Sequence, residues 1–206
     1  MTTLDHLVLA APDLPGTVDR IARALGVAPI AGGRHNGVGT RNYLLGLDDH
    51  SYLEIIGIDR DAPEPEHPRP FGLDTLTEPR LAAWLAQVSG IETVVRAARA
   101  AGFDPGEPRD MSRTTVEGEV LSWQLTAPFA TTGIVVVPYL IDWLDSAHPA
   151  RSLPRVSLRS FEAVHPDPAP VEAALDALGT KLTVAPGVAP ALIAVLDGPA
   201  GSITLV

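Results

Sequence analysis

The chain has 206 residues, of which 46% are hydrophobic, and a formal net charge of −10. This length allows a sizeable core in one or two compact units, and the low charge density argues against disorder. The acidic balance, without any Lys/Arg cluster, argues against nucleic acid as a partner, and no apolar run approaches the ~20 residues that span a bilayer.

The absence of cysteine excludes disulfides, thiolate nucleophiles and thiolate metal ligands. The N-terminus lacks the basic region of a signal peptide and leads directly into an apolar segment. We therefore expect a cytoplasmic protein that binds neither nucleic acid nor membranes.

Residues 1–58 predict a first unit with the order βαβββ. Alternating apolar residues indicate a strand over 3–10, with Leu4, His6 and Val8 on one face. Asp13 is a candidate N-cap for a helix over about 15–25, which Gly26 would end. Three further strands are expected over about 28–32, 40–47 and 51–58.

The Gly-rich stretch 32–39 separates two of these strands. It is not a dinucleotide fingerprint, because no helix follows it. One interpretation is a mobile loop at the mouth of a cavity, with His35 presented to a ligand. The other is an ordinary hairpin with a solvent-facing histidine.

The same order of elements recurs later in the chain. Residues 59–80 form a Pro-rich connector, and residues 81–142 form a second βαβββ unit. A second connector over 143–154 leads into a third, shorter βαβββ-like unit over 155–206. In the second unit we expect a strand over 81–88, a helix over about 91–101, and strands over about 111–116, 119–126 and 133–141. In the third, strands are expected near 181–185, 191–196 and 201–206.

His6 and Glu54 are the main candidates for chemistry, because each lies in an apolar strand of the first unit. His6 is either a core histidine satisfied by a neighbour or a functional group. An unpaired charge on Glu54 would be costly there, so Glu54 needs a metal, His6 or an arginine as partner. A buried glutamate with a raised pKa would suit a general base that removes a proton next to a carbonyl.

Other polar and aromatic side chains have two interpretations each. Asn42 is a hydrogen-bonding partner of a ligand or of the backbone, and Arg113 grips an anion or forms a surface salt bridge. Trp123 is a core residue or a platform for substrate, and Tyr139 could donate its hydroxyl group into a cavity. Asp142 either contacts a ligand or caps the chain locally.

Several short motifs are spread along the chain: Leu4-Asp5-His6, Gly33-Arg34-His35, Tyr52-Leu53-Glu54, Met111-Ser112-Arg113, Ile141-Asp142-Trp143 and His148-Pro149. Together they resemble the vicinal oxygen chelate superfamily, and within it the glyoxalase-like proteins related to glyoxalase, bleomycin resistance proteins and extradiol dioxygenases. The resemblance implies an α+β fold in which repeated βαβββ units form curved mixed sheets around an open cavity.

The resemblance also implies a divalent metal, such as Zn, Fe, Mn or Ni, held by ligands from the first and fourth strands of two units. His6 and Glu54 fit the positions of the first unit. In the second unit, Ala82 aligns with His6, and the last strand has no carboxylate before Asp142. The ligand set is therefore incomplete unless another histidine, such as His35 or His148, completes it.

These observations favour a small-molecule enzyme of isomerase, lyase or dioxygenase type, with Glu54 and His35 as catalytic residues. The substrate-binding candidates are Asn42, Arg113, Trp123, Tyr139, Asp142 and His148. The alternative is a metal-free protein of the same fold that binds and sequesters a small molecule. A structural role, with the uneven number of units paired across a homodimer, is a third alternative.

Overall fold

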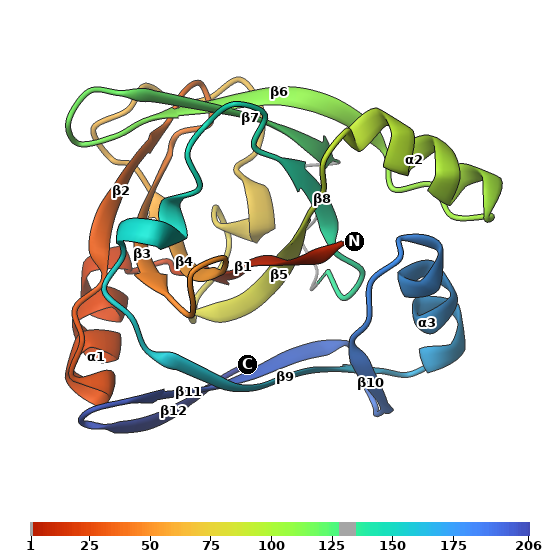
Figure 1. Cartoon of the computed structure of the whole chain (residues 1–206). Coiled ribbons are helices and arrows are strands. Elements are labelled where there is room, and N and C mark those ends of the chain that lie inside the picture. The colour runs from red at the N-terminus through yellow and green to blue at the C-terminus, as the bar shows by residue number, and fades with distance from the viewer. Residues whose placement is uncertain (1, 128–134) are drawn as a thin grey trace.

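The computed structural model describes residues 2–127 and 135–206. Figure 1 shows one group of strands wound around a central space and a second, flatter sheet beside it. Helices lie outside the wound strands and beside the flat sheet. The α+β class predicted from the sequence is confirmed.

The first unit has the predicted order of elements. It consists of β1 (Thr3–Ala10), α1 (Leu14–Leu25), β2 (Ile30–His35), β3 (Thr40–Gly46) and β4 (Tyr52–Ile58). The predicted caps of α1 are also confirmed: the Asp13 side chain accepts a hydrogen bond from the Gly16 amide, and Gly26 adopts a left-handed conformation with φ of 73°.

The expectation of a loop beginning at Gly32 is wrong, because β2 continues to His35 and only the following turn is irregular. Glycine weakens a strand, so two consecutive glycines suggested a loop. Here both serve close packing. A Cβ on Gly32 would lie 2.4 Å from Arg113 Nη1, and a Cβ on Gly33 would lie 2.2 Å from the carbonyl oxygen of Thr114.

The second unit repeats the order, with shifted strands. It consists of β5 (Arg80–Gln87), α2 (Ile91–Ala100), β6 (Glu107–Thr114), β7 (Val120–Ala127) and β8 (Tyr139–Asp142). The expected strand over 133–141 is too long: residues 133 and 134 lie outside the described residues, and residues 135–138 precede β8. Pro138 has no N–H group to donate to a ladder, which accounts for the late start.

The two units close on each other into a barrel with the strand order β1-β4-β3-β2-β6-β7-β8-β5. In each unit the first strand pairs parallel with the fourth. The units join through the antiparallel pairs β1–β5 and β2–β6. Alternate residues of β1 face opposite sides of the barrel wall: Leu7 and Leu9 pack in the outer core, and Val8 packs in the inner one.

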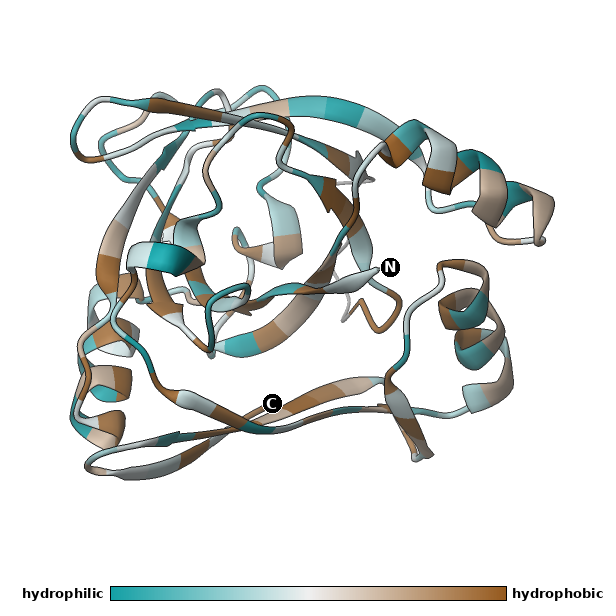
Figure 2. Cartoon of the chain, in the orientation of Figure 1, coloured by the Kyte–Doolittle hydropathy of each residue, from teal (hydrophilic) through white to brown (hydrophobic). Residues whose placement is uncertain are grey.

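The third unit has the same order of elements but a different sheet. It consists of β9 (Ser157–His165), α3 (Pro168–Ala177), β10 (Thr183–Pro186), β11 (Ala191–Gly198) and β12 (Gly201–Leu205). The strand order is β10-β9-β11-β12, so its first strand pairs parallel with its second strand and not with its fourth. The sheet packs on the barrel through an edge-to-face contact between Phe161 and Trp84, and a hydrophobic stretch along β11 is visible in Figure 2.

The connector over 59–80 folds across one end of the barrel. Arg69 is buried there and donates to the carbonyl oxygen of Gly39 and to the carboxylates of Glu64 and Asp74. These bonds fix the short 3₁₀ turn η1 (Pro70–Gly72), which contributes Pro70 and Phe71 to the lining of the barrel cavity. A second 3₁₀ turn, η2 (Pro149–Ser152), lies in the connector over 143–154. No helix in the described part of the chain is long and apolar enough to cross a membrane.

Candidate functional site

The interior of the barrel holds a cavity with apolar walls and a small group of polar side chains. Its volume is about 80 Å³, below the roughly 300–1,000 Å³ of sites for drug-sized ligands. It therefore suits a small molecule or one end of a larger one. The aromatic walls are formed by Tyr52, Phe71, Trp123, Tyr139 and Trp143.

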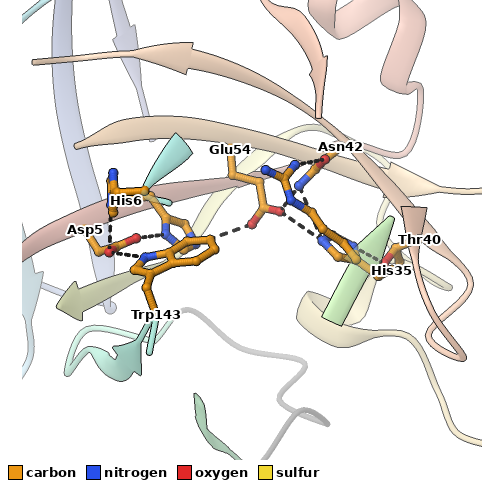
Figure 3. Close-up of polar contacts among 9 residues, drawn as sticks. Asp5, His6, His35, Thr40, Asn42, Glu54 and Trp143 are labelled. Carbon is orange, nitrogen blue, oxygen red and sulfur yellow. Dashed lines mark hydrogen bonds and ion pairs between the residues drawn. The ribbon is translucent and has the colours of Figure 1, made fainter. Parts of the chain in front are cut away.

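Glu54 on β4 is the carboxylate among the cavity-lining residues. Its Oε1 accepts a hydrogen bond of 2.6 Å from Asn42 Nδ2 and lies 3.5 Å from His35 Nε2. Its Oε2 lies 3.6 Å from His6 Nε2. Figure 3 shows the carboxylate between the two imidazoles. The structure thus brings together His6, His35, Asn42 and Glu54, all of them candidates from the sequence.

The carboxylate of Asp5 orients the imidazole of His6 by a hydrogen bond at Nδ1. The Nδ1 atom of His6 lies 2.6 Å from Asp5 Oδ1, and the imidazole stacks on Tyr52 at a centroid distance of 4.5 Å. Burial alone would lower the pKa of His6, but hydrogen bonds to Asp5 and Glu54 and their negative charges raise that pKa to about 9. His6 is therefore an imidazolium at neutral pH.

Glu54 shows the opposite shift. Burial alone would raise its pKa, but the hydrogen bond with His6, the charges of His35 and His6, and the hydrogen bond from Asn42 lower that pKa to about 2. The expectation of a raised pKa is therefore wrong, because the paired cation outweighs the cost of burial. Glu54 is a fixed anion at neutral pH.

His35 is neutral under the same conditions. Burial, with contributions from the positive charges of Arg113 and His6, lowers its pKa even though Glu54 opposes the shift. Its Nδ1 lies 2.9 Å from Thr40 Oγ1, and its Nε2 lies 3.4 Å from Asn42 Nδ2. Since Asn42 donates through Nδ2, its contact with Nε2 is compatible with the tautomer of His35 that carries its proton on Nδ1 and a lone pair on Nε2.

The remaining candidates fall into two groups. Trp123 and Tyr139 line the cavity, and Arg113 is buried beside Asn42. Asp142 and His148 are absent from the lining. Asp142 accepts from the backbone amides of Gly90 and Ile91 at the start of α2, and His148 Nε2 lies 3.1 Å from Asp5 Oδ2. In this structure these two residues hold other groups in place, and their role in substrate binding stays a prediction.

Asp5 is an ionisable site residue that the sequence candidates missed. It is fully buried, and Trp143 Nε1 donates to its Oδ2 at 2.8 Å. Strand alternation assigned Asp5 to the face opposite His6, but the register of β1 against β5 shifts between Leu4 and His6. Such an irregularity re-aims a side chain. The sequence signal that could have identified Asp5 is a carboxylate directly before a histidine in an otherwise apolar strand.

At the positions that match His6 and Glu54, the second unit has apolar residues. In the register, Leu85 corresponds to His6, because His6 pairs with Tyr52 in the way that Leu85 pairs with Tyr139. By the same register, Ile141 corresponds to Glu54. The sequence alignment of Ala82 with His6 was therefore displaced, although the inference that the second unit lacks ligands does not depend on it.

The donor set does not fit a divalent metal ion as it is arranged. No group of three or more His, Asp or Glu side chains able to hold a metal occurs within residues 2–127 and 135–206. The two oxygens of Glu54 face different imidazoles, and one of them accepts an N–H from Asn42. His6 and Glu54 are thus two candidate ligands, fewer than the three or four protein ligands of a zinc site.

This fold and cavity define a glyoxalase-like protein of the vicinal oxygen chelate superfamily, as the sequence motifs predicted. A family model described as "Glyoxalase-like domain" matches residues 4–179, and the chain belongs to that family. The fold and cavity are those of a small-molecule enzyme or small-molecule binding protein of this superfamily.

Solved structures are similar to parts or all of this chain. A hypothetical protein from Staphylococcus aureus is similar over 99% of this chain and 84% of its own, with a TM-score of 0.63 and 16% identity. A methylmalonyl-CoA epimerase from Mycobacterium tuberculosis is similar over 69% of this chain and 88% of its own, with a TM-score of 0.45 and 17% identity. Comparison with curated proteins gave no match.

Proposed function

We propose that this protein is an acid–base enzyme that moves a proton on a small, largely apolar substrate, as an isomerase or lyase does. One observation carries the proposal: a neutral imidazole, His35, and an ionised carboxylate, Glu54, lie 3.5 Å apart where an apolar cavity becomes polar. A base that is neutral near pH 7 is matched to proton abstraction at that pH.

In this mechanism His35 Nε2 accepts the proton from the substrate. The imidazolium that forms is stabilised by Glu54 Oε1, and the hydrogen bond between Nδ1 and Thr40 keeps the ring in place. Glu54 itself is too weak a base at a pKa of about 2, so its part is electrostatic. Return of the proton from His35 to another substrate atom completes an isomerisation, and loss of a leaving group completes an elimination.

His6 supplies the complementary positive charge. It lines the same cavity and is protonated at neutral pH, so it can stabilise an oxygen on which negative charge develops during proton removal. Asp5 fixes its orientation through Nδ1 and leaves Nε2 toward the cavity. The general acid–base contribution expected from such groups is roughly 10²–10⁴-fold in rate.

Proton exchange tests this proposal directly. We would incubate the protein in D₂O with a panel of small carbonyl compounds and follow loss of C–H signals by NMR. Exchange by the native chain should be lost in His35→Gln and kept in His50→Gln, because His50 is exposed in a turn outside the cavity. Equal exchange by His35→Gln and the native chain would sink the proposal.

A binding protein without catalysis is the second candidate. The aromatic walls and the already paired charges of His6 and Glu54 favour it, since such a site holds a ligand without needing to react with it. Saturable binding without exchange of any bound compound would decide for this candidate. The expected cytoplasmic location stays a prediction that cell fractionation can test. The expected homodimer stays a prediction that analysis of the oligomeric state can test.

A further inference from the structure

Arg113 is a buried cation beside the polar end of the cavity. It is only 5% exposed and lies on β6, directly across the ladder from His35 on β2. Its Nη1 donates to Asn42 Oδ1 at 3.3 Å. Among the described residues, no carboxylate lies within ion-pair distance of it. Its hydrogen-bonding partner is the amide of Asn42, which in turn donates to Glu54.

Another arginine of the same chain shows how such a charge is normally satisfied. Arg69 is 8% exposed, and its guanidinium pairs with both Glu64 and Asp74. Burying a cation without an anion is energetically costly, which explains why arginines at this depth are usually paired. Arg113 is therefore as deeply buried as Arg69, but among the described residues it has no carboxylate in an ion pair with it.

The backbone is shaped to admit this guanidinium. Gly32 on β2 leaves the space that Nη1 occupies, since a Cβ there would lie 2.4 Å from it. The Arg113 charge also acts on the cavity, because it contributes to the low pKa of His35 and opposes the raised pKa of Tyr52, and both of these residues line the cavity. A neighbouring residue of the same face, Met111, lines the cavity as well.

We infer that the substrate carries a carboxylate, which pairs with Arg113 while the adjoining carbon lies near His35. This inference rests on the proposed function for the mechanism, but its binding step can be tested alone. A guanidinium presents two parallel N–H donors that match a carboxylate. The carboxylate replaces the missing anion, and the apolar remainder of the substrate packs against Trp123 and Met111.

The test compares ligands that differ only in charge. The probes are two matched pairs, phenylacetate with phenylacetamide and hexanoate with hexanamide, measured by calorimetry and by the fluorescence of the cavity tryptophans Trp123 and Trp143. In the native chain each carboxylate should bind roughly tenfold or more tightly than its amide, because a charge-assisted hydrogen bond exceeds a neutral one.

Variants assign the preference to one residue. Arg113→Met should abolish the preference for carboxylates, and Arg113→Lys should retain part of it. Arg96→Met is the matched control, because Arg96 is exposed on α2 and contacts Thr93. Circular dichroism checks folding. If Arg113→Met does not fold, Arg113→Lys and the paired ligands on the native chain still decide the question.

The outcomes separate this inference from the proposed function. Equal affinity within each pair, or no binding of either carboxylate at millimolar concentration, overturns the inference. A preference for carboxylates that survives in Arg113→Met also overturns it. A preference that depends on Arg113, without any deuterium exchange, supports the inference and counts against the proposed proton transfer. Deuterium exchange together with equal affinity for the acid and the amide supports the proposed proton transfer and overturns the inference about the carboxylate.

Discussion

Glu54 and His6 face each other inside the barrel with Oε2 and Nε2 3.6 Å apart, and the pKa of each is displaced in the direction that favours its charged form. Neither side chain is more than 10% exposed. Both groups are therefore ionised through the whole neutral range. The pair is a permanent feature of the cavity, present before any ligand binds.

Protein stability should depend on pH on both sides of this pair. The pKa of His6 rises from 6.5 to about 9 on folding, so its contribution is complete below pH 6.5 and is lost as the pH rises through 9. The pKa of Glu54 falls from 4.5 to about 2, so its contribution is complete above pH 4.5 and is lost as the pH falls through 2. Urea unfolding from pH 3 to 10 should show maximal contribution from the pair between pH 4.5 and 6.5.

The matched variant for that experiment is Glu54→Gln. It should flatten the acid side of the pH profile, because the group that gains the proton is gone. A profile with an unchanged acid limb would assign the limb to other carboxylates. Glu66→Gln, at an exposed position of the connector, should leave the profile as it is.

Glu54→Gln should also destabilise the protein at neutral pH. It removes one partner of a buried charge pair and leaves the His6 cation with Asp5 alone, a change that costs on the order of 3 kcal/mol. Part of the loss is recovered if His6 releases its proton. Chemical unfolding at pH 6 and pH 9 measures both quantities, and a destabilisation that does not shrink at pH 9 would contradict this account.

Asp5→Asn should lower the pKa of His6. Asp5 supplies the first of the hydrogen bonds and charges that oppose the effect of burial on that group. NMR titration of the imidazole gives the value directly, and a pKa still close to 9 would show that Glu54 alone holds the proton. The proposed exchange reaction should slow in this variant, with recovery at lower pH, where His6 is protonated again.

Gly32→Ala should destabilise the barrel, because its Cβ would lie 2.4 Å from both Arg113 Nη1 and Asn42 Oδ1. The cost should be smaller in an Arg113→Met background, where one of the two contacts is relieved. Thermal unfolding of the four proteins in this double-mutant cycle gives the coupling. Equal costs in both backgrounds would show that Arg113 moves aside freely.

Sequence reasoning predicted the first unit well, because its signals are local. Asp13 and Gly26 mark the two ends of α1 because they cap it, and the alternation in β1 follows from strand geometry. It failed where a distant contact decides the outcome. Gly32 and Gly33 read as a loop because the side chain and backbone that fill their places come from β6 and the residues after it.

The site was predictable as a set of residues but not as a set of charges. His6, Asn42 and Glu54 were named from their places on predicted strands, and His35 was named from the Gly-rich stretch. The pKa of Glu54 could not be predicted, because burial and pairing act in opposite directions and only the distances show which prevails. Asp5 was missed because an irregular register, invisible in the pattern, turns it toward His6.

The register that matches Leu85 with His6 and Ile141 with Glu54 has a consequence for stoichiometry. A barrel made of two related halves has two equivalent positions at which a catalytic site could form. Here the first half holds His6 and Glu54, and the second half has the apolar Leu85 and Ile141 at the matching positions, so the two places are not interchangeable. Each chain should therefore accept a single ligand in a single orientation, with its reacting carbon toward His35 and Glu54.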